Sequence, residues 1–124
     1  MKQMLAIATG GALGAVMRWY VAGMIQRLSG SAFPWGTLTV NVLGSFMLGF
    51  LFVWMLERVT VGELARLAVT VGFMGAFTTF STFSVETVRL LQEGALSMAL
   101  GNVFGQIVVC VSLAWLGMLL ARAL

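Results

Sequence analysis

Four long apolar stretches constrain this chain more than any other feature of its sequence. They run approximately over Met4–Ile25, Thr37–Leu56, Leu64–Leu91 and Ala95–Ala121. A helix of about 20 mostly apolar residues can cross a hydrocarbon core about 30 Å thick. Lipid offers the backbone no hydrogen-bond partners, and a barrel would show short alternating segments, so helices are expected rather than strands. The sequence predicts an all-α membrane protein with one four-helix transmembrane domain over residues 1–124.

Composition supports a lipid bilayer as the solvent and excludes several classes of function. Hydrophobic residues make up 60% of the 124 residues and charged residues only 9%, whereas soluble domains average about 25% charged residues. The chain has no His or Asp and only one Cys and one Pro. The usual zinc sites, Ser-His-Asp triads and disulfide frameworks are therefore excluded. Without these groups an enzyme is not expected. The cations are spread along the chain without a clustered patch, so a nucleic-acid-binding protein is not expected either.

The first stretch has an alternative interpretation. A lysine followed by an apolar run is also typical of a secretory signal peptide. The run continues unbroken to Tyr20 and three further spans follow, which favours a retained helix. Glycines recur in all four stretches, and small residues of this kind allow membrane helices to pack closely.

The charges at the ends of the spans define the orientation only weakly. With four spans both termini lie on one side, which the positive-inside rule assigns to the cytoplasm. Four cations fall on that side and two on the other: Lys2, Arg58, Arg66 and Arg122 against Arg27 and Arg89. So small a bias would permit insertion in both orientations, and two inverted copies could pair about a twofold axis in the membrane plane. Four helices make a thin wall for a solute path, so we expect a dimer.

The segment GAFTTFSTFSVET in the third stretch carries unusual polarity. It has six hydroxyl side chains in thirteen residues, Phe77, Phe80 and Phe83 at every third position, and the carboxylate of Glu86. Hydroxyls in membrane helices can bond back to a carbonyl one turn earlier, and this explanation stays open for each one. Alternatively, the hydroxyls line a path where they replace part of a solute's hydration shell. Aromatic ring edges are partially positive, so such a path suits a small anion.

The overlapping segment GFMGAFTT, Gly72 to Thr79, predicts a helix break near the middle of the third span. Two glycines three residues apart, followed by adjacent β-branched threonines, weaken helical hydrogen bonding there. A break exposes carbonyls, which are tolerated at membrane depth when buried in protein and are good ligands for a hard monovalent cation. In an inverted dimer the two breaks would meet at the twofold axis.

Three segments together resemble the signature blocks of the CrcB/Fluc family of fluoride ion channels: GGALGAVMRWY, GTLTVNVLGSF and GAFTTFSTFSVET. Their order, their spacing and the four spans match over essentially the whole chain, and the third block is the most specific. The resemblance implies a dual-topology, antiparallel homodimer in the inner (plasma) membrane. Two narrow pores would let fluoride leave the cell down its electrochemical gradient. Fluoride that enters as HF ionises in the cytoplasm, so a passive leak would be enough for resistance.

The resemblance also implies roles for individual residues. Backbone carbonyls of Gly75 and Thr78 from both chains would surround a structural sodium ion, although Ala76 stands where the family often has a second glycine. The ring edges of Phe80 and Phe83 would contact fluoride. The remaining implied positions are Asn41 opposite the rings, hydroxyls along the route at Ser81, Thr82 and Ser84, the carboxylate Glu86 near the route, and Arg18 near a pore vestibule.

Several of these residues have other interpretations. Arg18 beside Trp19 and Tyr20 is also typical of an interfacial belt with a snorkelling arginine. Asn41 could simply join two helices, and the phenylalanines could simply pack. In the fourth span, three residues at a spacing of four could form a second wall of the route or join helices: Asn102, Gln106 and Cys110.

Two rival functions also remain. A small multidrug exporter has four short spans, but proton-coupled antiport of cationic drugs calls for a membrane-embedded carboxylate, typically in the first helix. The first helix here carries Arg18 instead. In a structural or regulatory membrane subunit, the polar third span would serve only helix association.

Overall fold

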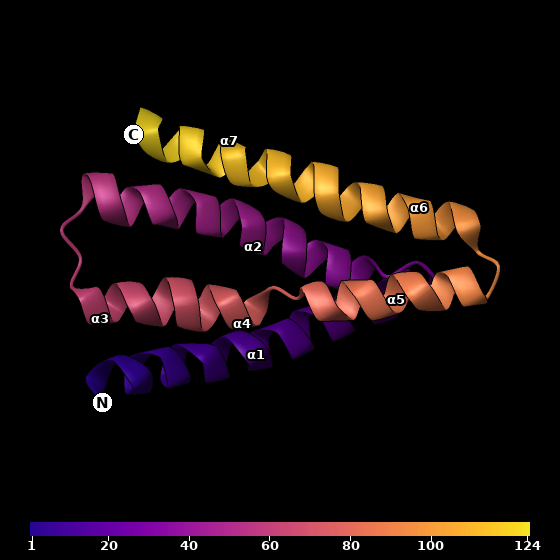
Figure 1. Ribbon diagram of the computed structural model, residues 1–124, viewed down its shortest axis with the longest axis horizontal. Coiled ribbons are helices and arrows are strands. Elements are labelled where there is room, and N and C mark those ends of the chain that lie inside the picture. The colour runs from indigo at the N-terminus through magenta and orange to yellow at the C-terminus, as the bar shows by residue number, and fades with distance from the viewer.

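The computed structural model of the chain is built from helices joined by short connections (Figure 1). It describes every residue except for the side chain of Arg58, so that one cation of the orientation count lies outside the described residues. In the described part of the chain no strand occurs. Four helical segments are long and apolar enough to cross a membrane: Lys2–Ser29, Trp35–Glu57, Glu63–Gln92 and Leu96–Ala123. The prediction of an all-α protein with four membrane spans is confirmed.

The spans differ in regularity. The first is one helix, α1 (Lys2–Ser29), and the second is α2 (Trp35–Val53) followed by a π-helical turn, η1 (Trp54–Arg58). The third contains α3 (Glu63–Arg66), π-helical η2 (Leu67–Met74), α4 (Gly75–Phe77) and α5 (Phe80–Gln92). The fourth contains α6 (Leu96–Phe104), π-helical η3 (Gly105–Val109) and α7 (Cys110–Ala123).

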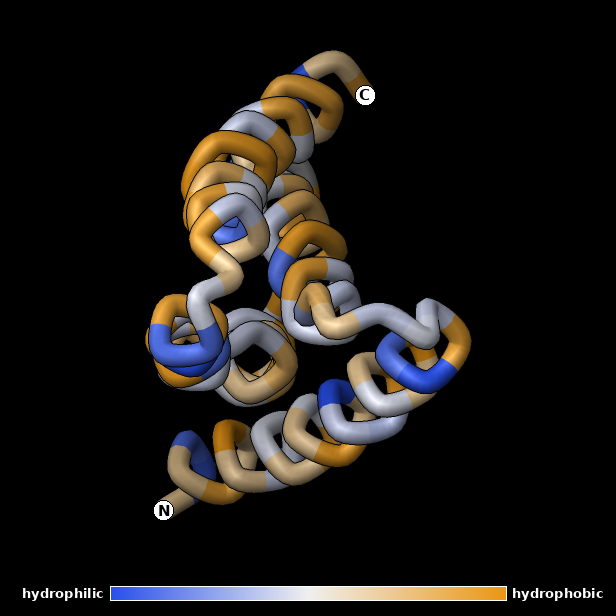
Figure 2. The backbone as a smooth tube through the Cα atoms, turned by 90° about the vertical axis from the view of Figure 1, so that its right-hand side faces the viewer, coloured by the Kyte–Doolittle hydropathy of each residue, from blue (hydrophilic) through white to orange (hydrophobic). Residues whose placement is uncertain are grey.

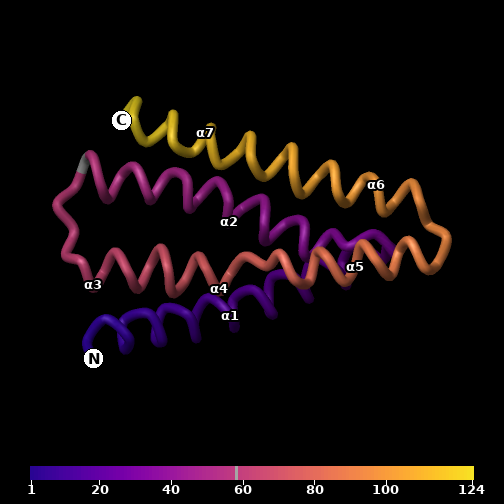
Figure 3. The backbone as a smooth tube through the Cα atoms, viewed as in Figure 1, coloured from indigo at the N-terminus to yellow at the C-terminus, as the bar shows by residue number. Residues whose placement is uncertain are grey.

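Hydrophobic residues run along all four spans (Figure 2). The chain runs back and forth between two ends of the bundle (Figure 3). Both termini and the connection from η1 to α3 lie at one end, and the connections from α1 to α2 and from α5 to α6 lie at the other. At the end with the termini, Nη2 of Arg122 lies 3.6 Å from Oε1 of Glu57, and Gln3 donates to Glu63 at 2.9 Å.

Glycines bring the helix backbones together, as the sequence predicted. α1 packs against η2 and α4, and α2 packs against α7. A Cβ atom at Gly10 or Gly14 would overlap a backbone carbonyl of η2, and a Cβ at Gly49 would overlap one of α7. Small residues permit this close packing of helices. In lipid such packing matters, because apolar side chains gain little free energy by moving from lipid into the protein interior. The close contacts fix the first and third spans side by side, which positions the polar residues described next.

Candidate functional site

Two residues inside the third span leave the helical conformation. Thr78 has φ −85° and ψ 159°, and Thr79 has φ −154° and ψ 112°, so both are extended between α4 and α5. In a continuous α-helix the N–H of Thr79 would donate to the carbonyl of Gly75. Here it donates to Oδ1 of Asn41 at 2.7 Å. The extended pair therefore releases the Gly75 carbonyl from its helical donor.

Asn41 on α2 binds both backbone groups of Thr79. Its Oδ1 accepts from the Thr79 N–H, and its Nδ2 donates to the Thr79 carbonyl at 3.0 Å. The same Nδ2 donates to Oε1 of Gln106 at 2.8 Å. Because unpaired backbone groups are costly at membrane depth, Asn41 supplies the partners that the helix no longer gives Thr79. Asn41 thus joins helices, one of its two predicted roles, and it also lines a cavity.

Gly44, one turn further along α2, allows this close approach. A Cβ atom at this position would overlap Cγ2 of Thr78 and lie 3.3 Å from Cδ1 of Phe77. The extended pair thus packs directly against the bare backbone of α2. The position of the Asn41 amide depends on this contact.

The helix that follows the extended pair begins in the interior of the span. Thr79 caps α5, since its Oγ1 accepts from the N–H of Thr82 at 3.2 Å and donates to Oγ1 of Thr82 at 2.9 Å. The first N–H groups of a helix have no helical acceptor, and this end carries a partial positive charge. α5 therefore presents a partially positive end inside the membrane span, a place that favours an anion.

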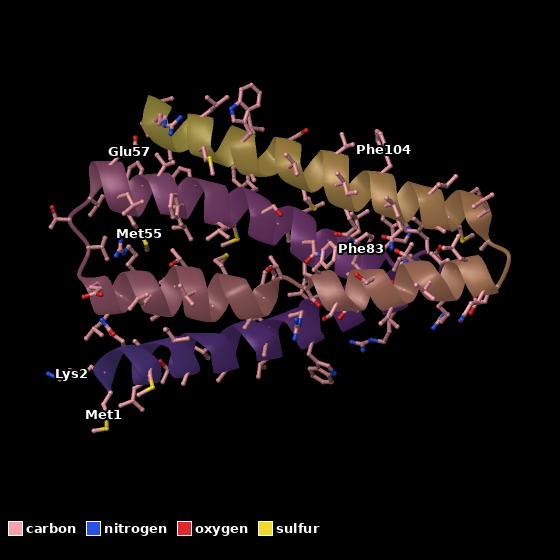
Figure 4. The ribbon with its side chains drawn as sticks, viewed as in Figure 1. Met1, Lys2, Met55, Glu57, Phe83 and Phe104 are labelled. Carbon is pink, nitrogen blue, oxygen red and sulfur yellow. The ribbon has the colours of Figure 1, made fainter. Side chains whose placement is uncertain are left out.

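A cavity of about 240 Å³, which we call the phenylalanine cavity, lies beside the start of α5. Phe83 is 7% exposed and Phe80 77% exposed. Their ring centroids lie 5.2 Å apart with the ring planes at 65°, an edge-to-face arrangement. Figure 4 shows Phe83 between α5 and the fourth span, whereas Phe104 points away from the bundle. Besides Thr78 and Thr79, polar side chains from three other elements line the cavity: Asn41, Ser45, Gln106 and Cys110.

A second cavity of about 420 Å³, which we call the arginine cavity, lies between α1, α2 and α5. Arg18 and Arg27 line it, and Nη1 of Arg18 donates to the Thr78 carbonyl at 3.2 Å. Thr79 lines both this cavity and the phenylalanine cavity. The extended pair therefore lies between the two, and Arg18 contacts the extended pair as well as the larger cavity.

Glu86 lines the arginine cavity and also a smaller one of about 150 Å³, which it shares with Gln26, Pro34 and Arg89. Its Oε1 accepts from the Thr37 hydroxyl at 2.7 Å. Its Oε2 is buried without a hydrogen-bond partner among the described residues. The carboxylate thus lies between the arginine cavity and the connection from α1 to α2, with one oxygen held by α2.

The hydroxyls around the start of α5, over residues 78–87, divide into two groups. Thr78, Ser84 and Thr87 donate to the carbonyl four residues earlier, at 3.1, 2.9 and 2.8 Å. For these three the bonding-back explanation holds. Ser81 and Thr82 are exposed, and both lie within 3.4 Å of the capping hydroxyl of Thr79. Thr82 lines the arginine cavity, whereas Ser84 lines a separate hollow beside Val85 and Val88.

The polar face of the fourth span is buried, and its members differ in their contacts. Asn102 donates to the Thr87 hydroxyl at 3.0 Å and so joins α6 to α5. Gln106 and Cys110 line the phenylalanine cavity, and Asn41 donates to Gln106. Asn102 therefore joins helices, whereas Gln106 and Cys110 lie beside a cavity.

Two residues of the site were missed by sequence reasoning. Thr79 is the cap of α5, and a threonine just before a run of helix-forming residues is a recognised start signal. Thr37 holds Glu86, but it is 49 residues away in the chain and no local pattern links the two.

Comparison with known proteins identifies relatives of this chain. Residues 5–118 match the family described as CrcB-like protein, Camphor Resistance (CrcB). A protein of Citrifermentans bemidjiense is 43% identical over 124 residues, which cover both chains completely. One of Magnetococcus marinus is 48% identical over 97% of this chain and 98% of its own length, and one of Methylococcus capsulatus is 49% identical over 98% of this chain and 53% of its own length. All three are named fluoride-specific ion channel FluC. The chain therefore belongs to the CrcB-like family.

Proposed function

We propose that this chain is a passive, fluoride-selective ion channel that lets cytoplasmic fluoride leave the cell down its electrochemical gradient. The observation that carries the proposal is the similarity, at 43% to 49% identity over at least 97% of this chain, to proteins named fluoride-specific ion channels. This function is transport and calls for no catalytic group.

The chemistry of the phenylalanine cavity supports the proposal. Fluoride is small and strongly hydrated, so it enters a pore only where hydrogen-bond donors or positive edges replace its water. The edge-to-face pair of Phe80 and Phe83 offers aromatic edges, and the first turn of α5 offers N–H groups and a partial positive charge. We propose that these groups line the pore, with Asn41 opposite the rings.

The arginine cavity is proposed as the vestibule. Arg18 and Arg27 bring positive charge to it, which raises the local concentration of an anion. Ser81 and Thr82 are proposed to offer hydroxyls along the route, whereas the hydroxyl of Ser84 donates to the Phe80 carbonyl of its own helix. Glu86 would repel fluoride unless protonated or turned aside, and its hydrogen bond from Thr37 holds one oxygen away from the rest of the route. We therefore assign Glu86 to the border of the route.

An antiparallel homodimer in the inner (plasma) membrane is part of the proposal. Phe80 is 77% exposed in the single chain, and Gly75, Ser81 and Thr82 on the same stretch are also exposed. Polar groups facing acyl chains are costly, so this stretch needs a cover. A second, inverted copy would supply the cover and complete two pores. The weak charge bias of the spans permits both orientations.

A structural sodium ion at the dimer centre is proposed on the carbonyls of Gly75 and Thr78. In a continuous helix the N–H of Thr79 would donate to the Gly75 carbonyl, but here it donates to Asn41 instead. The Thr78 carbonyl accepts from Arg18, but a carbonyl oxygen has two lone pairs and keeps one for a cation. These residues therefore fit a hard monovalent cation shared by two copies. Replacing sodium by N-methylglucamine should loosen the dimer on size-exclusion chromatography, and an unchanged dimer would refute the site.

Efflux from vesicles tests the proposed function. Vesicles that contain only this chain should release fluoride quickly without a proton gradient and should retain chloride, whereas protein-free vesicles should retain both. Equal passage of chloride would refute selectivity. Efflux that requires a proton gradient would indicate a coupled exporter, and no efflux at all would favour a structural subunit.

A further inference from the structure

The carbonyl of Thr78 accepts a hydrogen bond from a charged side chain of another span. In a continuous helix this carbonyl would accept from the N–H of Thr82, but that N–H donates to Oγ1 of Thr79 at 3.2 Å. Nη1 of Arg18 donates to the Thr78 carbonyl instead, also at 3.2 Å, and no other donor reaches this oxygen in the described part of the chain. A guanidinium of the first span thus replaces a lost backbone bond of the third.

Gly14 brings Arg18 to this place. Residues four apart lie on the same face of a helix, so both of them face the third span. A Cβ atom at Gly14 would overlap the carbonyl of Phe73, and its absence lets α1 approach the third span closely. Arg18 therefore reaches Thr78 directly, although 60 residues separate the two in the chain.

The positive charge of Arg18 has no carboxylate beside it. Among the described residues Arg18 forms no ion pair, and Glu86, which lines the same cavity, accepts from Thr37 instead. A charge inside a membrane span is costly unless it is paired or hydrogen-bonded. The guanidinium has five N–H groups, and the one hydrogen bond that it forms is to Thr78. The other N–H groups are available to an anion in the arginine cavity.

The Thr78 carbonyl is also a ligand of the proposed sodium site. An oxygen that accepts from a guanidinium gives less electron density to a cation on its second lone pair, and the two positive charges repel each other. An anion bound to the guanidinium would reduce this repulsion. The occupancy of the arginine cavity should therefore change how strongly the Thr78 carbonyl holds a cation.

We propose that Arg18 couples these two places. An anion in the arginine cavity strengthens cation binding at the Thr78 carbonyl, and a cation at that carbonyl strengthens anion binding in the cavity by the same factor. The inference rests on the proposed sodium site and adds a control of its affinity. In the proposed dimer each copy brings one Arg18 to the shared cation, so the dimer is most stable when both cavities hold an anion.

The stability of the dimer in detergent measures this coupling without ion flux. Sodium would be titrated against N-methylglucamine at constant ionic strength and pH, with either fluoride or lactobionate as the anion, and thermal unfolding would be followed. Lactobionate is a bulky sugar acid whose charge approaches a recessed guanidinium less closely than fluoride does. We expect the sodium concentration for half-maximal stabilisation to be about fivefold lower, or more, in fluoride.

Chloride separates the arginine cavity from the proposed pore. A cavity of about 420 Å³ admits either halide, whereas the proposed pore excludes chloride. Chloride should therefore lower the sodium requirement much as fluoride does. This comparison uses only the unmodified chain, so it stands even if a variant of Arg18 fails to fold.

Arg18→Gln tests the residue itself, because it removes the charge from the Thr78 carbonyl. In this variant less sodium should be needed in lactobionate than in the unmodified chain, and the choice of anion should no longer matter. The matched control is Arg89→Gln, which removes a charge that pairs with Glu93 and does not line the arginine cavity. This control should keep the full anion dependence.

Each result has a distinct meaning. Equal sodium requirements in fluoride and lactobionate would overturn the coupling and leave the sodium site in place. An anion effect that persists in Arg18→Gln, that disappears in Arg89→Gln, or that fluoride shows without chloride would overturn the role of Arg18. A dimer that sodium does not stabilise would overturn both the coupling and the sodium site. Fluoride efflux is measured separately, so the proposed channel function is judged on its own result.

Discussion

At the residue scale, the two phenylalanines of the cavity have very different surroundings. Phe83 is packed between α5 and the fourth span, whereas most of the Phe80 ring is exposed. A packed ring keeps its edge in one place and so needs no reorganisation when an ion arrives. An exposed ring is held by its edge-to-face contact with Phe83 and, in the proposed dimer, by the second copy.

Replacing either ring tests whether its edge matters. We expect Phe83→Ile and Phe80→Ile to abolish fluoride flux while the dimer persists, because isoleucine keeps bulk but lacks the positive edge. Flux from vesicles and the elution position in detergent measure the two effects. Phe104→Ile is the matched control, since Phe104 is 64% exposed and points away from the bundle. Unchanged flux in both cavity variants would mean that the two rings only fill space and that their edges do not contribute to ion passage.

Sequence patterns identified some site residues and not others, for a physical reason. The resemblance to the CrcB/Fluc family, carried by three segments of the sequence, pointed to Phe80, Phe83 and Asn41, and these three do line one cavity. Spacing cannot tell whether a hydroxyl bonds back to its own helix, as Ser84 does. It also cannot pair residues distant in the chain, such as Asn41 and Gln106.

At the scale of the elements, the extended pair depends on contacts between spans. A break was expected within Gly72 to Thr79 from two glycines and two threonines. The glycines Gly72 and Gly75 are helical, and the extended residues are the threonines, Thr78 and Thr79. The sequence supplies weak helical propensity in this stretch, and Asn41 decides where the helix ends by binding both backbone groups of Thr79. The π-helical segments η2 and η3 were not predicted, because an extra residue in a turn leaves no trace in an apolar sequence.

The contact between α2 and the extended pair can be tested at Gly44. In Gly44→Ala the new methyl group would overlap Thr78 and push α2 away, which would weaken the bonds between Asn41 and Thr79. We expect a loss of stability of about 1–3 kcal/mol, the usual effect of overpacking, together with reduced flux. Thermal unfolding in detergent and vesicle efflux would measure both.

Gly101→Ala is the matched control for this substitution. The nearest atom to its new methyl group would be Cε2 of Phe33 at 3.6 Å, an ordinary contact, so stability and flux should not change. If Gly44→Ala were as stable and as active as the control, the close contact at Thr78 would not matter for the site.

At the scale of the whole molecule, the four spans were the most predictable feature. Apolar length is read directly from the sequence, and the four helical segments extend over the expected stretches. Which surfaces of the chain face lipid and which face another protein cannot be predicted from apolar length. Phe80, Ser81 and Thr82 are exposed in the single chain, and in the proposed dimer the second copy would cover them.

Dual topology can be tested with reporters fused after Leu124. Because the cations divide only four against two between the ends of the spans, we expect comparable numbers of chains in each orientation. A reporter active only in the cytoplasm and one active only outside should therefore both give signal. Signal from one side alone would contradict an antiparallel dimer.

Selective passage of fluoride is tested most directly by the reversal potential of a planar bilayer that contains only this chain. Fluoride would stand on one side and chloride at the same concentration on the other, at equal pH. We predict a large reversal potential, with the sign that opposes fluoride movement, because chloride barely contributes to the current. A reversal potential near zero would mean that both halides pass, and it would contradict a fluoride-selective pore.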